Sequence, residues 1–167
     1  MEEISNLRKL QLEELKILKM FKKICEENDL RYYLLGGTLL GAVRHDGFIP
    51  WDDDVDVCMP REDYEKFQKI ADKQLEKPYY LRSLENNNDY RYCFARIATE
   101  NMKIKNSSAN IPRIEDVWID IIPLDGMPAG KVKNFFHKAH MYFWRSMNQI
   151  GQYDEIVDQK RKRGKIE

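Results

Sequence analysis

Residues 30–60 decide the fold of this chain, and they read LRYYLLGGTLLGAVRHDGFIPWDDDVDVCMP. An apolar run ends at Gly36 and Gly37, a short helix is predicted over residues 38–44, and residues 52–56 then carry four aspartates. Glycines let a backbone approach a ligand closely, and the N–H groups at a helix start attract anions. A glycine turn followed shortly by carboxylates is therefore the pattern expected of a site for a metal-bound phosphate ester.

The acidic segment is predicted to be a strand that carries its charges on one face. Because side chains alternate across a strand, Asp52, Asp54 and Asp56 are expected to share one face, with Asp53 pointing away as a cap or ion-pair partner. The apolar side chains of residues 55–59 then face the core. Three like charges on one face repel, and a cation removes the conflict; carboxylates are ligands for Mg²⁺, with Mn²⁺ as the alternative. The competing interpretation is a solvated turn.

Three other residues complete the predicted site. Asp120 lies in the middle of the apolar segment WIDII, residues 118–122, and is the best candidate for a further carboxylate ligand; the alternatives are an edge-strand charge or a buried salt bridge. Thr38 is expected to cap the short helix and to offer a hydroxyl donor. Arg44 is expected either to clamp a phosphate or to act as a charge at the helix C-terminus. This set suits attack of an alcohol on an activated phosphate ester, with an aspartate taking the proton.

The composition excludes several classes of protein. The chain has 167 residues, 43% hydrophobic and 34% charged, with zero net charge, which is typical of a soluble globular domain and offers no bulk charge for nucleic-acid binding. No apolar run is long enough to span a bilayer, and the charged N-terminus lacks the pattern of a signal peptide. A cytoplasmic location, extending to the inner face of the membrane, is expected. The three cysteines are widely spaced and predict reduced structural thiols.

The remaining periodicities predict an α+β domain, with a mixed β-sheet flanked by helices. Residues 1–28 are expected to form an amphipathic helix packed on the domain of residues 29–150, and residues 151–167 a charged, frayed tail. Further helices are predicted over residues 61–75 and 131–150. The latter is basic and aromatic, so it either packs on the core or touches a membrane surface. Strands are predicted over residues 32–35, 79–84, 92–99, 102–104 and 117–122.

Three segments closely resemble the signature of the LicD family, which includes the bacterial phosphocholine transferases and is related to fukutin-like proteins: LLGGTLLGAVRH at 34–45, GFIPWDDDVDV at 47–57 and WIDIIPLDG at 118–126. The resemblance implies a nucleotidyltransferase-type fold. It implies Mg²⁺ held by Asp54 and Asp56, with Asp52 nearby and Asp120 as the third carboxylate. Asp54, Asp56 and Asp120 are then the catalytic residues, and the expected donor-binding residues are Gly36, Gly37, Thr38 and Arg44.

The same resemblance implies a reaction. It implies transfer of a phospho-substituent, such as phosphocholine from CDP-choline, to a sugar of a surface glycan or its lipid-linked precursor, as in lipopolysaccharide or teichoic acid modification. Two alternatives stay open: transfer of a nucleoside monophosphate to a small molecule or protein, and a truncated fragment that binds nucleotide without catalysis. Such proteins usually continue well beyond the segment 118–126. The chain is therefore expected to be a truncated or short member of the family, in which the acceptor half of the site is missing.

Overall fold

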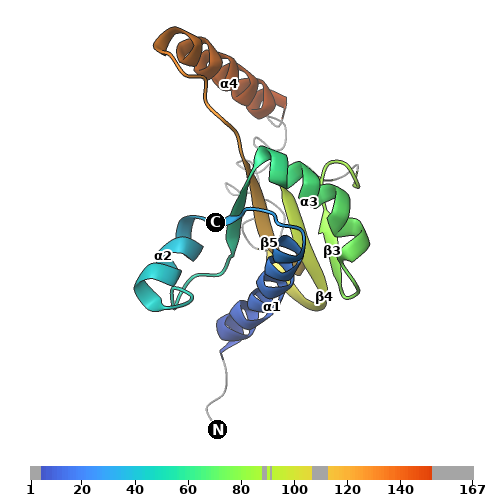
Figure 1. The fold of residues 1–167 in the computed structure, drawn as a ribbon. Coiled ribbons are helices and arrows are strands. Elements are labelled where there is room, and N and C mark those ends of the chain that lie inside the picture. Colours follow the sequence, from blue (N-terminus) through green and yellow to red (C-terminus); the bar gives the residue numbers. More distant parts are fainter. Residues whose placement is uncertain (1–4, 88–89, 91, 107–112, 152–167) are drawn as a thin grey trace. The chain divides into compact units, whose positions relative to one another are not determined.

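A computed structural model describes residues 5–87, 90, 92–106 and 113–151 of the chain (Figure 1). The chain divides into two compact units, Met1–Lys105 with Ile114–Asp125, and Asn106–Arg113 with Gly126–Glu167. All the predicted site residues lie in the first unit. The predicted charged tail, apart from its first residue, lies outside the described residues.

The described residues form four helices and a five-stranded mixed sheet flanked by helices, which confirms the predicted α+β class. The sheet has the order β1-β2-β5-β4-β3; β1 is antiparallel to β2, β2 is parallel to β5, and β3 is antiparallel to β4. In chain order the elements are α1 (Asn6–Glu27), β1 (Tyr33–Leu34), α2 (Gly36–His45), β2 (Asp56–Pro60), α3 (Arg61–Gln74), β3 (Tyr79–Arg82), β4 (Ala95–Asn106), β5 (Arg113–Leu124) and α4 (Lys131–Gly151).

Helices α1 and α3 both contribute to the core of the first unit. The ring of Phe21 on α1 meets that of Phe67 on α3 edge-on, with centroids 5.2 Å apart, and both side chains are fully buried. Fully burying a side chain of this size stabilises the fold by about 1.5–3 kcal/mol. The predicted core-facing side chains of the acidic segment are buried, as expected: Val55, Val57 and Met59. Figure 1 shows α1 and α3 lying over the sheet, with α2 beside the side of the sheet that β1 and β2 form.

Several predicted strand boundaries were wrong, because the pairing between strands sets where each strand begins and ends. Strand β2 begins at Asp56 and not at Asp52, because its ladder to β5 begins with the pair Asp56 and Asp120. The segments predicted as separate strands, 92–99 and 102–104, belong to one strand, β4. Its polar middle is held by packing: Thr99 is fully buried, and the side-chain amide of Asn101 donates a hydrogen bond to Glu13 of α1.

Helix α2 also begins earlier than predicted. It starts at Gly36, whose φ of +56° lets the chain turn directly from β1 into the helix. The expected cap, Thr38, has another partner: its hydroxyl accepts a hydrogen bond of 2.9 Å from the Asp56 backbone N–H. Thr38 therefore ties α2 to the start of β2.

The second unit contains α4, which was predicted over residues 131–150. Within this unit its large apolar side chains are exposed, among them Phe135, Phe136, Phe143 and Trp144. Neither packing of this apolar stripe on the domain nor contact with a membrane surface is tested by the structure, and both stay predictions. Among the described residues, no helix is long and apolar enough to cross a membrane.

The three thiols differ in their accessibility, and this gives a test of the fold. Cys25 and Cys58 are buried, whereas Cys93 is exposed. Burial raises the pKa of Cys25 to about 12 and also raises that of Cys58, and a thiol must ionise to react as a nucleophile. We expect a disulfide reagent to modify one thiol rapidly in the native protein and all three in denaturant. Cys93→Ser should abolish the rapid phase, and two rapid thiols in the native protein would contradict the fold.

Candidate functional site

The site lies where three segments come together: the junction between β1 and α2, the start of β2, and the part of β5 that pairs with the start of β2. Asp56 and Asp120 are partners in the parallel ladder, and the Asp120 backbone N–H donates to the Val55 carbonyl oxygen at 2.9 Å. On the other side of β2, the Leu35 N–H donates to the Asp56 carbonyl at 3.0 Å. Two parts of the chain that are far apart in sequence are thereby fixed next to each other by backbone hydrogen bonds.

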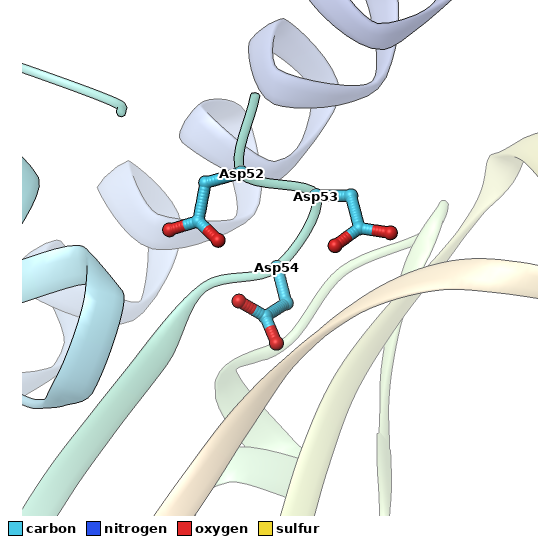
Figure 2. Close-up of side chains that lie close together, drawn as sticks. All are labelled: Asp52, Asp53 and Asp54. Atoms are coloured by element: carbon cyan, nitrogen blue, oxygen red, sulfur yellow. The ribbon is translucent and has the colours of Figure 1, made fainter. Parts of the chain in front are cut away.

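The carboxylates of Asp52, Asp53 and Asp54 gather in the segment just before β2 (Figure 2). One oxygen from each lies within 4.8 Å of the others; Asp52 is half-buried, and the other two are exposed. The prediction that Asp53 points away was wrong, because these residues precede the strand and the alternation of a strand does not apply to them. Oxygen atoms at this spacing match the ligand preference of Mg²⁺ and similar hard cations.

Asp56 and Asp120 belong to the same electrostatic cluster. Burial raises the pKa of Asp56, and the charges of Asp120 and Asp52 raise it further. Burial likewise raises the pKa of Asp54, with Asp56, Asp52 and Asp53 adding to the effect. Of the aspartates that the sequence predicted as metal ligands, the structure places Asp52 and Asp54 in the cluster with oxygens within 4.8 Å, whereas Asp56 and Asp120 act on it through their charges. Their roles as ligands and catalysts stay predictions.

The two glycines lie directly against this cluster. A Cβ atom on Gly37 would lie 2.5 Å from Oδ2 of Asp52, and one on Gly36 would lie 3.5 Å from Oδ2 of Asp56. The absence of side chains therefore lets the N-terminus of α2, which carries partial positive charge, approach the carboxylates. Arg44, in contrast, is exposed in the last turn of α2, at the far end of the helix from the glycines. Its role as a phosphate clamp stays a prediction.

Arg96 is a site residue that the sequence analysis missed. Its Nε lies 2.6 Å from Oδ1 of Asp120, and its side chain is only 7% exposed. The guanidinium also lies over the rings of Tyr92 and Trp118, 4.0 and 4.5 Å from their centroids. The buried salt bridge that the sequence analysis gave as an alternative for Asp120 is therefore present. The negative charge of Asp54 nevertheless raises the pKa of Asp120. An arginine inside the apolar strand segment ARIAT, residues 95–99, was the available signal.

Helix α1 contributes two further residues that the sequence analysis missed. Gln11 is 3% exposed, and its amide donates hydrogen bonds to the carbonyls of Ile49 and Asp52, at 3.2 and 2.9 Å. Glu14 is 2% exposed, and burial together with Asp54 and the neighbouring aspartates raises its pKa to about 8. Both are polar residues on the buried face of an amphipathic helix, and that placement was the available signal.

Replacing Gly37 by alanine tests the close approach of α2. The new Cβ would overlap the end of the flexible Asp52 side chain, so we expect the carboxylate to move while the free energy of unfolding changes by less than about 1 kcal/mol. Mn²⁺ affinity, measured by titration calorimetry, should fall about tenfold. Gly126→Ala is the matched control, because a Cβ there meets open space. Unchanged Mn²⁺ affinity in Gly37→Ala would contradict the arrangement.

Removing Arg96 tests the buried ion pair. Arg96→Met leaves the Asp120 carboxylate without its partner, and we expect the free energy of unfolding in urea to fall by about 3 kcal/mol. The double variant Arg96→Met/Asp120→Asn should regain part of that loss, because it removes the uncompensated charge as well. A loss below about 1 kcal/mol in the single variant would show that Arg96 does not stabilise Asp120.

Comparison with known proteins identifies the family of this chain. Residues 29–153 match the family model described as LicD/FKTN/FKRP, nucleotidyltransferase domain. The lipopolysaccharide cholinephosphotransferase LicD of Haemophilus influenzae is 37% identical over 126 residues, 73% of this chain and 45% of that protein. An uncharacterized protein of Rickettsia prowazekii is 40% identical over 82 residues, 49% of this chain and 30% of its own length.

The human ribitol 5-phosphate transferase FKRP is 52% identical over 40 residues, which is 24% of this chain and 8% of that protein. The chain thus spans less than half the length of each of these curated relatives. The family match nevertheless covers most of the chain, including both glycines and all the aspartates of the site. The chain therefore belongs to the LicD/FKTN/FKRP nucleotidyltransferase-domain family.

Proposed function

We propose that this chain catalyses the cation-dependent transfer of a phosphocholine-type group from a CDP-activated donor, such as CDP-choline, to a sugar hydroxyl of a cell-surface glycan or its lipid-linked precursor. The observation that carries the proposal is the cluster of the Asp52, Asp53 and Asp54 carboxylates, with the charge of Asp56 acting on Asp54, in a chain that belongs to the LicD family. Two relatives are named for transfer of a phospho-substituent, phosphocholine in one and ribitol 5-phosphate in the other. Both names describe the same type of reaction, the transfer of a phospho-substituent.

The residues present fit Mg²⁺ or Mn²⁺. The donor set consists of carboxylate oxygens, which such cations prefer. Burial raises the pKa of Asp54 and Asp56, and repulsion from the neighbouring aspartates raises it further. We propose that Asp54, Asp56 and Asp120 hold the cation, with Asp52 and Asp53 beside them. When bound, the cation would neutralise the charge of the donor phosphates and of the leaving nucleotide.

The remaining residues would then bind the donor and move the proton. The N-terminus of α2 at Gly36 and Gly37 offers backbone N–H groups and a positive dipole end to the diphosphate. The acceptor hydroxyl oxygen attacks the phosphorus that carries the choline, and the bond from that phosphorus to the CMP oxygen breaks. Asp54 is exposed, and we propose that the carboxylate oxygen of Asp54 that does not hold the cation accepts the hydroxyl proton. CMP leaves as the second product.

A second candidate function is nucleotidyl transfer, which the description of the family domain favours. In that reaction the acceptor attacks the other phosphorus, so that CMP is attached to the acceptor and phosphocholine leaves. The two reactions use the same donor, cation and carboxylates, and differ only in which phosphorus is attacked. Labels on the choline and on the nucleotide separate them. The third possibility, binding of nucleotide without catalysis, predicts no labelled product at all.

Doubly labelled CDP-choline tests the proposal together with Asp54→Asn. With an acceptor extract of envelope glycans and Mg²⁺, the choline label should enter the glycan and the nucleotide label should appear as CMP. Chelation should stop the reaction, and Asp54→Asn should lower its rate about a hundredfold or more. Asp46→Asn is the matched control, since Asp46 lies outside the cluster, at the C-terminal end of α2.

The product decides between the candidate functions. Nucleotide label on the acceptor would replace the proposed reaction by nucleotidyl transfer. Full activity in Asp54→Asn would contradict the proposed catalytic role of the aspartate cluster. Donor binding without a labelled product from any acceptor extract would favour the binding function.

A further inference from the structure

We propose that Glu14 of α1 belongs to the cation site, as a carboxylate ligand that contacts the cation directly or through one bound water molecule. The inference rests on the cation dependence proposed above and adds a residue to that site. Glu14 precedes the residues matched by the family model, which begin at residue 29. It would make α1 part of the functional site as well as part of the core.

The first observation is the state of the Glu14 side chain. It is 2% exposed, and its Oε2 atom has no hydrogen-bond partner within the part of the chain that the structure describes. An ionised carboxylate can accept several hydrogen bonds, and buried polar atoms without any partner are rare in folded proteins. The Glu14 carboxylate therefore requires a partner that the described residues do not supply.

The second observation is what surrounds this carboxylate. The four strongest charges that act on Glu14 are all negative, and they belong to Asp54, Asp53, Asp52 and Asp120 in that order. Three of these residues form the cluster in which oxygen atoms lie within 4.8 Å of one another. The repulsion among these carboxylates is removed either by a proton on Glu14 or by a cation between the side chains, but a proton neutralises Glu14 alone. A divalent cation is the partner that satisfies Glu14 and the aspartates together.

The preceding residue of the same helix shows the contrast. Glu13 is also buried, at 6% exposed, yet both of its oxygens have protein partners. Lys16 Nζ lies 2.6 Å from Oε2, and the Asn101 amide donates to Oε1 at 3.1 Å. The described residues thus supply hydrogen-bond partners to both oxygens of Glu13 but none to Oε2 of Glu14.

The third observation is that α1 is fixed against the cluster. Gln11 lies one turn before Glu14, and its side-chain amide donates hydrogen bonds to the carbonyls of Ile49 and Asp52. These bonds tie α1 to the acidic segment itself, which runs beside the helix (Figure 2). The position of Glu14 relative to the aspartates is therefore set by the fold rather than by a mobile side chain alone.

Mn²⁺ binding to Glu14→Gln tests the inference without any activity assay. Glutamine keeps the shape and removes the charge, so we expect Mn²⁺ affinity, measured by electron paramagnetic resonance titration, to fall tenfold to about a hundredfold. The thermal midpoint in chelator should not fall, because no favourable contact of Oε2 is lost. Glu13→Gln is the matched control and should behave in the opposite way, with a lower thermal midpoint and unchanged Mn²⁺ affinity.

The outcomes separate this inference from the proposed function. If the unchanged protein binds no Mn²⁺, the proposed cation site fails, and the role of Glu14 fails with it. If the unchanged protein binds Mn²⁺ and a folded Glu14→Gln binds it equally well, only the inference about Glu14 is overturned. Should Glu14→Gln not fold, the anomalous signal of Mn²⁺ in crystals of the unchanged protein decides. A cation bound to Glu14, or one water molecule away, supports the inference; a more distant cation overturns it.

Discussion

The burial of a carboxylate beside other carboxylates is the constraint on which this structure depends. Burial and neighbouring aspartates raise the pKa of Glu14 from 4.5 to about 8, so the folded protein holds its proton more tightly than the unfolded chain does. Stability therefore falls as the pH rises between those two values. Ionising Glu14 costs on the order of 5 kcal/mol more in the fold than in water, at about 1.4 kcal/mol for each pKa unit. That is comparable with the entire net stability of many domains, about 5–15 kcal/mol.

The surrounding structure offsets part of this repulsion, each time by a specific contact. Arg96 is buried against Asp120 and has aromatic rings on its guanidinium, so one positive charge is held permanently inside the cluster. The N-terminus of α2 adds partial positive charge, and it can come close only because residue 37 lacks a side chain. Apolar burial holds the strand itself, because Val57 and Met59 lie in the core. A bound cation would supply the remaining compensation.

The sequence predicted most of the elements, but only part of the site. Asp120 could be found because it is the one charged residue within the apolar segment WIDII. The apolar alternation correctly placed Val55, Val57 and Met59 in the core, but it did not show that Cys58, on the opposite face of the strand, is buried as well. The start of β2 could not be found, because it depends on where β5 pairs with it, and the wrong position of Asp53 followed from that error. Glu14 was missed because helical periodicity identifies the buried face without showing which distant charges lie opposite it.

The carboxylates differ in how firmly the fold holds them, and this difference suits cation binding. Asp56 and Asp120 lie on paired strands, where ladder hydrogen bonds and the core fix the backbone. Asp52–Asp54 lie in an extended segment that is held by the Gln11 amide and by a backbone bond of 3.0 Å from the Asp52 N–H to Ile49. Mg²⁺ demands nearly octahedral geometry, so some ligands must be placed in advance while others adjust. In the proposed cation site, the two strands would meet the first requirement, and the segment before β2, which is hydrogen-bonded to α1, would meet the second.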